Sequence, residues 1–320
     1  MSITEETRAR LAEIPNLTVF TDAPLSRYTR FAIGGPADLY AETPNAEAFM
    51  AASAVARASG MEIMVIGAGT NLIVSDAGYR GIVLRYHGDR LLAANGRVQA
   101  EAGAVLQDLV DFAIARGLAG LEALSGIPGS VGAAVYGNAG AYGHSIAERV
   151  VNVRFYDGQK IRVFDHEECQ FLYRESIFKR HKDWIIFSTE LRLDAADAHT
   201  LREAADSILK VRNEKFPVTM KCAGSIFKNL LMKDLPPDVA AQVPASAVRE
   251  GKVPAAWFLE QVGAKGTVRG DIHVATYHAN LIYNAGAGTA ADLCALIREL
   301  KGRVADRFGL NIEEEVQYVL

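Results

Sequence analysis

Cysteine is scarce in this sequence, and its few copies form no metal-binding or disulfide pattern. Cys169, Cys222 and Cys294 lie more than fifty residues apart, so no C-x-x-C pair occurs. The seven histidines include no H-x-H or H-E-x-x-H motif, and these motifs are the usual signatures of a zinc site. We therefore expect neither a bound metal ion nor a disulfide framework.

Long apolar runs and an excess of basic residues are also missing. No apolar run approaches the ~20 residues of a membrane span, and residues 1–6 are polar and acidic, unlike the apolar region of a secretory signal. The net charge is -4, with acids and bases interspersed, so no basic stripe indicates nucleic acid or an anionic membrane. These absences predict a cytoplasmic protein that acts on small molecules.

Half of the 320 residues are apolar, which is enough to form the cores of about two domains. Short β-like runs separated by glycine-rich turns cover residues 61–66, 72–75, 81–86, 98–101, 149–156 and 184–193. No internal repeat and no Pro- or Ser-rich linker is present. The pattern predicts an α+β fold with a domain boundary near residue 200.

Three helices are expected, over residues 104–116, 200–213 and 289–308. The first stops at Gly117. Thr200 and Glu203 form a possible capping box for the second. Thr289 can cap the third, and Gly309 can end it. A strand is expected to close the chain.

The first glycine-rich loop, Gly67-Ala68-Gly69, follows a β-like run as a dinucleotide-binding fingerprint does. A Rossmann turn needs a third small residue where this chain has Leu72, and a helix where this chain continues into another β-like run. The loop therefore joins two strands. Closely spaced glycines still let backbone N–H groups converge on an anion, so a pyrophosphate cradle and an ordinary turn both stay open.

The second glycine-rich segment, residues 126–143, holds six glycines in eighteen residues. Glycine at this density is costly in conformational entropy and is expected where backbone lies against a ligand or adopts positive φ. A flexible surface loop is the ordinary alternative. The interspersed Ile127, Val131 and Tyr136 argue against disorder, so we favour ligand contact.

Together these loops resemble the FAD-binding domain of the vanillyl-alcohol-oxidase or PCMH type, and specifically the MurB reductases of bacterial cell-wall synthesis. The motifs that carry the resemblance lie at residues 33–38, 67–75, 125–132, 138–143, 173–179, 223–229 and 313–316. The resemblance implies a PCMH-type FAD-binding domain over residues 1–200, with its core at about 28–196. A smaller α+β substrate-binding domain follows over residues 201–320.

The resemblance implies reduction of UDP-N-acetylglucosamine enolpyruvate to UDP-N-acetylmuramate, a peptidoglycan precursor, by a monomer. NADPH is then the hydride source and FAD is bound non-covalently. The FAD contacts that it implies are Gly34, Gly35, Gly67, Ala68, Gly69, Thr70, Asn71, Ser75, Gly126, Pro128, Gly129, Gly132, Asn138, Gly140 and Ala141.

The sequence departs from the family pattern in three places. Ala134 stands where glycine is frequent, Asn229 is followed by leucine instead of proline, and only 51 positions separate Arg174 from Ser225. The short spacing resembles the form of the family that lacks a tyrosine lid loop. An insertion at residues 231–254, rich in Pro and Ala, matches no family feature.

Reduction of an enolpyruvyl ether adds hydride to the terminal CH₂ carbon and a proton to the adjacent carbon, while negative charge spreads into the substrate carboxylate. No side chain donates hydride, so reduced flavin must supply it from N5. Arg174 suits the carboxylate, because guanidinium is permanently charged and its planar fork matches that group. A lone arginine would be interpreted as a surface residue, and the resemblance is what assigns it to the substrate.

Glu315 falls on the expected closing strand, whose alternation places Glu313, Glu315 and Gln317 on one face. The opposite, apolar face is formed by Leu310, Ile312, Val316, Tyr318 and Leu320. A solvated polar face is the ordinary interpretation. The resemblance implies that Glu315 points at the substrate, where a neutral acid shares the enolate charge with Arg174, and that Glu313 faces solvent.

Ser225 lies in a turn of small residues, where a serine ordinarily bonds to backbone. The resemblance implies that its hydroxyl delivers the proton. A serine is a weak acid, so close positioning against a strongly basic carbanion must replace acidity. Softer matches assign substrate binding, including the diphosphate, to Tyr173, Lys215, Asn229 and His278, although His278 could equally be a core histidine.

Two other readings compete with this one. A flavoprotein oxidase of the same fold often attaches its flavin to His or Cys, and neither glycine-rich loop contains these residues. A non-catalytic flavin- or nucleotide-binding protein would leave Arg174 and Ser225 without a role.

Overall fold

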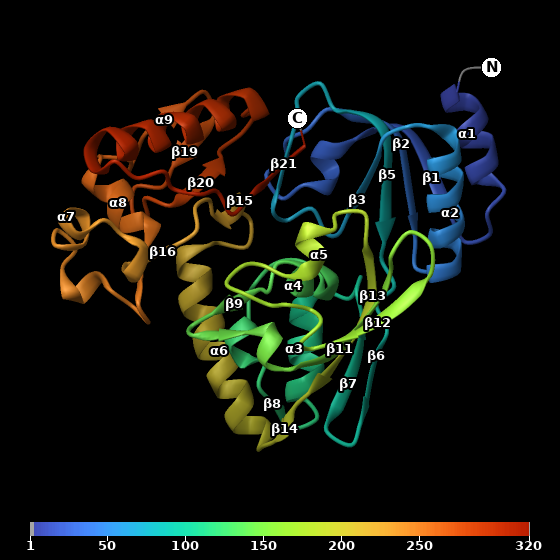
Figure 1. The fold of residues 1–320 in the computed structure, drawn as a ribbon, viewed down its shortest axis with the longest axis horizontal. Coiled ribbons are helices and arrows are strands. Elements are labelled where there is room, and N and C mark those ends of the chain that lie inside the picture. The colour runs from blue at the N-terminus through green and yellow to red at the C-terminus, as the bar shows by residue number, and fades with distance from the viewer. Residues whose placement is uncertain (1–2, 320) are drawn as a thin grey trace. The chain divides into compact units, whose positions relative to one another are not determined.

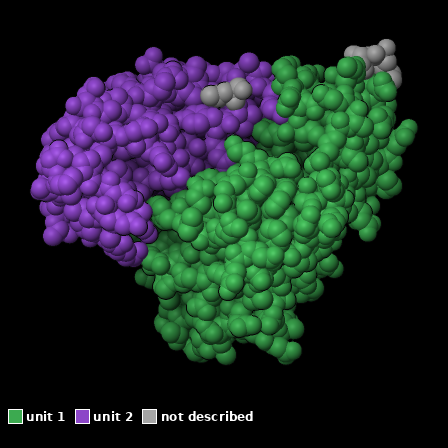
Figure 2. All heavy atoms as spheres, in the orientation of Figure 1, with its two compact units in different colours: residues 1–23, 37–69, 80–214 green, residues 24–36, 70–79, 215–320 purple. Residues whose placement is uncertain are grey.

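The computed structural model describes residues 3–319, whose contacts divide into two compact units (Figures 1 and 2). Within the described residues, unit 1 comprises 3–23, 37–69 and 80–214, and unit 2 comprises 24–36, 70–79 and 215–319. Two short segments from the first part of the chain thus belong to unit 2. As a boundary between functional domains, residue 200 stays a prediction.

The two largest sheets of unit 1 have four and five strands. The four-stranded sheet has the order β1-β2-β5-β3, with β1 (Thr18–Pro24), β2 (Pro36–Thr43), β5 (Tyr79–Tyr86) and β3 (Ile63–Ile66). The five-stranded antiparallel sheet has the order β12-β11-β13-β7-β6, with β12 (Ile161–Asp165), β11 (Val150–Tyr156), β13 (Ile185–Arg192), β7 (Arg97–Glu101) and β6 (Leu91–Ala94). Helix and strand are mixed throughout, which confirms the predicted α+β class.

Helices cover these sheets, namely α1 (Ile3–Ala12), α2 (Ala46–Ser59), α3 (Leu106–Ile114), α4 (Val131–Tyr136), α5 (Ile177–Arg180) and α6 (Ala198–Lys215). The predicted helix at 104–116 is confirmed as α3, whose apolar face buries Leu109, Val110 and Ala113. Gly117 follows with φ of 65°. Edge-to-face rings of Phe49, Tyr86 and Phe187 lie in the core of the unit.

The capping box predicted for the second helix is wrong. Helix α6 begins at Ala198, and the preceding Asp197 accepts hydrogen bonds from both the N–H and the hydroxyl of Thr200, each at 2.9 Å. An aspartate carboxylate is a strong acceptor for the N–H groups of a first turn. Glu203 instead faces His199 at 3.7 Å on the exposed surface.

Unit 2 has a sheet of order β15-β20-β19-β18, formed by β15 (Lys221–Ser225), β20 (Leu281–Asn284), β19 (Ile272–Val274) and β18 (Val268–Arg269). Helix α9 (Ala290–Phe308) packs against β18 and β19 (Figure 1). Thr289 caps it by accepting from the Asp292 N–H, and Gly309 ends it with φ of 65°. Both ends of the predicted third helix are therefore confirmed.

The closing segment is a strand only over β21 (Gln317–Val319), which pairs in parallel with β4 (Leu72–Val74). Leu310, Ile312 and Val316 are buried as the alternation predicts, whereas Tyr318 is 38% exposed. The chain bends at 315–316 before β21, so one alternation cannot run through the whole segment. The predicted face is wrong at Tyr318, and Leu320 lies outside the described residues.

The insertion at residues 231–254 is packed into unit 2. Its ends pair as β16 (Leu230–Leu231) and β17 (Lys252–Val253). Between them, Leu235, Val239 and Val243 are buried in the same core as α9 and the neighbouring α8 (Ala255–Gln261). The insertion therefore enlarges the hydrophobic core of this unit. No helix within residues 3–319 is long and apolar enough to cross a membrane.

Two substitutions at helix α9 should change the stability of the protein in opposite directions. Gly302 is an exposed helical residue with open space around the position of an added Cβ, so Gly302→Ala should raise the free energy of unfolding by roughly 0.5–1 kcal/mol. Thr289→Ala removes the cap and should lower it by about 1 kcal/mol. Urea titration followed by circular dichroism measures both, and a loss of stability in Gly302→Ala would contradict the assignment.

Candidate functional site

Ser225 and Glu315 are brought onto neighbouring backbone segments of unit 2. Ser225 is the last residue of β15, and residues 226–228 then run antiparallel to residues 313–315. The Glu315 N–H donates to the Ile226 carbonyl at 2.7 Å, and the Lys228 N–H donates to the Glu313 carbonyl at 2.9 Å. Two of the predicted catalytic residues, distant in sequence, therefore lie on neighbouring backbone segments.

The three consecutive glutamates at this place have different surroundings. The Glu313 side chain is 70% exposed and lies 3.1 Å from the Lys228 ammonium, so its predicted solvent-facing position is confirmed. Glu314 pairs with Lys301 at 2.8 Å. Glu315 is half-buried, as Glu314 is, whereas Glu313 is exposed.

The loop predicted to bind FAD is tied to the Glu315 segment. The Asn71 side chain donates to the Glu315 carbonyl at 2.9 Å, and the Asn71 carbonyl accepts from the Gln317 N–H at 2.9 Å. Farther along, the Ser75 N–H donates to the Val319 carbonyl at 2.7 Å, and its carbonyl accepts from the Gly35 N–H at 2.8 Å. The loop joins β3 to β4 with no helix between them, which confirms the exclusion of a Rossmann turn.

Gly34 and Gly35 have a packing reason to lack a side chain. A Cβ on Gly35 would lie 2.3 Å from the Asp76 carbonyl oxygen, and one on Gly34, where φ is 131°, would lie 2.9 Å from the Val74 Cβ. An added Cβ at either position would have to displace these neighbouring atoms, which is energetically costly. Close packing within unit 2 therefore explains these glycines, whether or not they also touch a cofactor.

Arg174 lies at the tip of a tight turn in unit 1. Leu172 and Glu175 exchange backbone hydrogen bonds of 3.0 and 3.1 Å across it, and Arg174 has φ of 59°. A non-glycine residue in this left-handed region costs about 1–3 kcal/mol, and such residues cluster at functional sites. The Arg174 guanidinium donates to the Gly140 carbonyl at 2.8 Å, and its carbon lies 5.1 Å from the centre of the Tyr173 ring.

Neighbouring side chains hold this strained turn. The Lys179 ammonium donates to the Arg174 carbonyl at 2.9 Å and pairs with Glu175 at 2.8 Å. Asn138, itself at φ of 43°, donates from its amide to the Leu172 carbonyl at 2.8 Å. Asn138 and Gly140, predicted as FAD contacts, thus support the Arg174 turn. Lys179 was not predicted as a site residue, although it belongs to the motif at 173–179 that carries the family resemblance.

The loop at 125–132 has fewer available backbone donors than its glycine count suggests. The Gly126 N–H donates to the Gln107 side chain at 2.7 Å, and the Gly132 N–H donates to the Ala102 carbonyl at 2.8 Å. A Cβ on Gly132 would lie 2.7 Å from that of Ala102. Hydrogen bonding and packing within unit 1 therefore account for Gly126 and Gly132.

The same loop nevertheless fits a polar ligand. Ser125 is fully buried, and its hydroxyl has no hydrogen-bond partner among the described residues. Such an orphaned group is rare and indicates a partner supplied by water or a ligand. Gly129 nearby has φ of 125°, and a Cβ on Gly67 would lie 3.1 Å from the Ser130 hydroxyl. The two glycine-rich loops thus meet in unit 1, as a shared FAD site requires. Their remaining predicted members are Ala68, Gly69, Pro128 and Ala141 in unit 1 and Thr70 in unit 2.

The predicted substrate residues of unit 2 have distinct local partners. The Lys215 carbonyl accepts from the Tyr277 hydroxyl at 3.0 Å. The Asn229 side-chain oxygen accepts from the Ala255 N–H at 3.3 Å, in the first turn of α8. His278 accepts through Nδ1 from the Asn280 N–H at 3.2 Å. Burial, together with the positive charge of Lys215, lowers the pKa of His278 to about 4, so its ring is neutral near pH 7.

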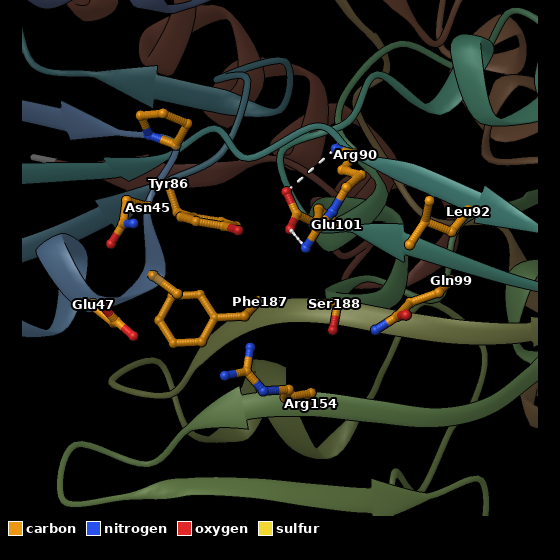
Figure 3. Close-up of a pocket in the computed structure, with 12 residues that line it drawn as sticks. Asn45, Glu47, Tyr86, Arg90, Leu92, Gln99, Glu101, Arg154, Phe187 and Ser188 are labelled. Carbon is orange, nitrogen blue, oxygen red and sulfur yellow. Dashed lines mark hydrogen bonds and ion pairs between the residues drawn. The ribbon is translucent and has the colours of Figure 1, made fainter. Parts of the chain in front are cut away.

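A cavity of about 540 Å³ lies in unit 1 away from these residues (Figure 3). The ion pair of Arg90 and Glu101, at 3.3 Å, crosses one side of it. The Arg154 guanidinium carbon lies 5.7 Å from the centre of the Phe187 ring. None of the predicted site residues lines this cavity. Among residues 3–319 no group of three or more His, Cys, Asp or Glu side chains is placed to hold a metal ion.

Comparison with known proteins adds independent findings. Residues 216–319 match the family model described as UDP-N-acetylenolpyruvoylglucosamine reductase, C-terminal domain, and residues 37–160 match an FAD binding domain. A UDP-N-acetylenolpyruvoylglucosamine reductase of Solibacter usitatus (strain Ellin6076) is 70% identical over 310 residues, covering 97% of this chain and 99% of that protein. The reductase of Geotalea uraniireducens (strain Rf4) is 34% identical, with 99% of each chain covered.

A solved structure is similar over nearly the whole chain. The crystal structure of UDP-N-acetylenolpyruvylglucosamine reductase (MurB) from Thermus caldophilus matches with a TM-score of 0.72 and 28% sequence identity. The match covers 94% of this chain and 98% of that chain.

The packing role of Gly35 can be separated from a role in binding FAD. Gly35→Ala should lower the free energy of unfolding of the FAD-free protein by about 1–3 kcal/mol or more, because the new Cβ overlaps the Asp76 backbone. Gly137→Ala is a matched control, since its Cβ would lie 3.5 Å from the nearest atom. If FAD-free Gly35→Ala unfolds like the parent protein but binds FAD weakly, the packing explanation fails.

Proposed function

We propose, from the premise that the chain belongs to the UDP-N-acetylenolpyruvoylglucosamine reductase family, that Arg174, Ser225 and Glu315 carry out the chemistry of its reaction. The protein reduces UDP-N-acetylglucosamine enolpyruvate to UDP-N-acetylmuramate in peptidoglycan synthesis, using FAD and NADPH. The observation that carries this function is the 70% identity to the S. usitatus reductase over 97% of the chain.

FAD, reduced by NADPH, supplies the hydride when it is bound. We propose that this chain holds it with the glycine-rich loops at 67–75 and 125–132, supported by residues 34–35 and 138–141. The orphaned Ser125 hydroxyl supports this assignment, because a buried donor and acceptor needs a partner. No His or Cys lies in the two glycine-rich loops, so no ordinary attachment residue is at hand and binding is non-covalent.

Arg174 binds the substrate carboxylate and the charge that grows on it. The guanidinium is held by its hydrogen bond to the Gly140 carbonyl, and the backbone of Arg174 is held by the bond from Lys179 to its carbonyl. A guanidinium held in place needs no reorganisation as charge develops, and this is the main advantage of a preorganised site. Tyr173 lies beside it on the same turn and contacts the substrate.

Ser225 delivers the proton to the carbon next to the carboxylate, and Glu315 shares the enolate charge. The backbone bond between Ile226 and Glu315 supports this pairing, because it holds the two side chains on adjacent segments. Lys215, Asn229 and His278 bind the diphosphate and its neighbouring groups. His278 is neutral near pH 7, so it contributes a hydrogen bond while Lys215 contributes the charge.

Further assignments belong to the same proposal. The FAD-binding domain spans residues 1–200 and the substrate domain spans 201–320. The protein is a cytoplasmic monomer of the short form, without a tyrosine lid. The anaerobic visible spectrum of the purified protein tests the function as a whole. A flavin spectrum that NADPH bleaches and the enolpyruvyl substrate restores is expected. If the substrate does not restore the spectrum of the reduced flavin and oxygen admitted afterwards does, an oxidase is favoured. A flavin that NADPH never bleaches would favour a binding protein.

Replacement of Ser225 separates the two half-reactions. Ser225→Ala should let NADPH reduce the flavin at near the parent rate, because that transfer does not use the hydroxyl. Reoxidation by substrate should slow on the order of 10²- to 10⁴-fold, which is the usual contribution of a positioned acid. Ser225→Cys should recover part of the rate, since a thiol is a stronger acid of similar shape. Anaerobic stopped-flow absorbance measures both rates.

Equal slowing of both half-reactions in Ser225→Ala would contradict this role. The serine would then support the cofactor pocket, not the proton transfer.

Arg174 and Glu315 should act together on the enolate. Arg174→Ala and Glu315→Ala should each lower kcat, and the double variant should lose less than the product of the two single effects, because they stabilise one developing charge. Steady-state kinetics of the four proteins measures the coupling. Glu313→Ala is a matched control with an exposed carboxylate and should keep the parent kcat. Fully multiplicative losses would exclude shared action.

A further inference from the structure

Asn280 is a buried amide that contacts the segment directly after Ser225. It is 2% exposed and precedes β20. Its side-chain oxygen accepts from the Phe227 N–H at 2.9 Å, and its side-chain nitrogen donates to the Phe227 carbonyl at 2.9 Å. Its own carbonyl accepts from the Ile226 N–H at 3.1 Å. One residue thus satisfies three backbone groups of residues 226–227.

These three hydrogen bonds form the Asn280 clamp. The clamp lies where the sheet itself loses its regular pairing. Cys222 pairs with Tyr283 and Ser225 pairs with Leu281, so three steps along β15 oppose two along β20. Gly224, within the irregularity, has φ of 81°. A bulge re-aims the side chains around it and interrupts the ladder. The orientation of Ser225 therefore depends on what holds the backbone on its far side. Asn280 bonds to residues 226–227 there, beside the pairing of residues 226–228 with residues 313–315.

The same clamp reaches Glu315 through one residue. The Ile226 N–H donates to Asn280, and the Ile226 carbonyl accepts from the Glu315 N–H at 2.7 Å. A shift of residues 226–227 would therefore move Ser225 and Glu315 together.

Asn280 is itself held in place. Its N–H donates to Nδ1 of His278 at 3.2 Å, and the low pKa of His278 keeps that nitrogen available as an acceptor near pH 7. Lys215 has the largest charge effect on the His278 ring, and Glu260 and Lys265 add weaker ones. The centre of the Phe216 ring lies 6.1 Å from that of His278. The side-chain amide therefore has a fixed orientation, with its oxygen facing the Phe227 N–H and its nitrogen facing the Phe227 carbonyl.

We propose that Asn280 is a positioning residue for the proton-transfer step, acting through residues 226–227 to aim Ser225 and to place Glu315. This rests on the proposed roles of those two residues. Asn280 does not touch the substrate in this proposal. Its removal should slow the second half-reaction without changing the first.

Asn284, the last residue of β20, provides a matched control four positions after Asn280. It is 4% exposed, and its amide likewise makes several backbone contacts, to the Phe31 carbonyl at 3.0 Å and the N–H groups of Gly286 and Gly288 at 3.0 and 2.9 Å. Within residues 3–319, its amide makes no hydrogen bond to residues 225–228 or 313–315. Asn280→Ala and Asn284→Ala should lose stability to a similar degree, since each removes a buried hydrogen-bonded amide.

Stopped-flow absorbance at saturating FAD, well below the unfolding temperature, distinguishes the two variants. Both should be reduced by NADPH at near the parent rate. Reoxidation by the enolpyruvyl substrate should slow roughly 10- to 100-fold in Asn280→Ala, because small misplacements of a reacting group have effects of this order. Asn284→Ala should reoxidise within about twofold of the parent, and the substrate Kd of the oxidised protein should stay unchanged in both.

The double variant Asn280→Ala/Ser225→Ala tests whether Asn280 acts through Ser225. Its reoxidation should slow by less than the product of the two single effects, because the part of the Asn280 effect that runs through Ser225 is already lost and only the part through Glu315 remains. Fully multiplicative losses would contradict action through Ser225. If Asn280→Ala does not fold, Asn280→Asp keeps an acceptor for the Phe227 N–H but loses the donor to its carbonyl, and its reoxidation should also slow.

Parent-rate reoxidation in a folded Asn280 variant, with slow reoxidation in Ser225→Ala, would overturn this inference and leave the proposed function standing. Equal slowing in Asn280→Ala and Asn284→Ala would overturn it as a general stability effect. Parent-rate reoxidation in Ser225→Ala would instead overturn the proposed role of Ser225.

Discussion

The candidate chemistry of unit 2 depends on one backbone interaction, the hydrogen bond from the Glu315 N–H to the Ile226 carbonyl. It joins the end of β15 to the closing segment of the chain and so places a hydroxyl and a carboxyl on neighbouring segments. The remaining contacts keep this pairing in register. Asn71 fixes the Glu315 carbonyl from one side, and Asn280 fixes residues 226–227 from the other. Asparagine suits both tasks, since one amide can donate and accept at once.

The Arg174 turn in unit 1 is held in place differently from the Ser225 and Glu315 segments of unit 2. Here the backbone of Arg174, the proposed carboxylate-binding residue, is itself strained, with φ of 59°, and two other side chains hold it. Lys179 and Asn138 each bond to a carbonyl of the turn. Strain of this kind persists only when surrounding contacts over-determine it. In both units, side-chain to backbone hydrogen bonds thus hold the backbone at a proposed catalytic residue.

Glycine density was a useful but incomplete guide to the cofactor loops. Gly35 and Gly132 are explained by the close approach of Asp76 and Ala102, so neither alone is evidence for a ligand. The firmer structural indication is Ser125, a buried hydroxyl with no partner within residues 3–319. A missing side chain can reflect packing or binding, whereas a buried polar group without a partner leaves an interaction to be completed.

The sequence by itself determined the α+β class, helices α3 and α9 with the caps of α9, and the strand-to-strand loop at Gly67, because these follow from local periodicity and end signals. Motif resemblance added the family and the residues to examine. Only the tertiary structure decided that Asp197 begins α6, that Tyr318 is exposed, and that Asn280 holds the Ser225 segment. The sequence offers both Asp197 and Thr200 as caps, and only the folded chain shows which one accepts. The bend at 315–316 breaks the alternation before Tyr318. The Asn280 contact joins residues 53 positions apart, and hydrogen bonds between residues far apart in the chain leave no periodic trace in the sequence.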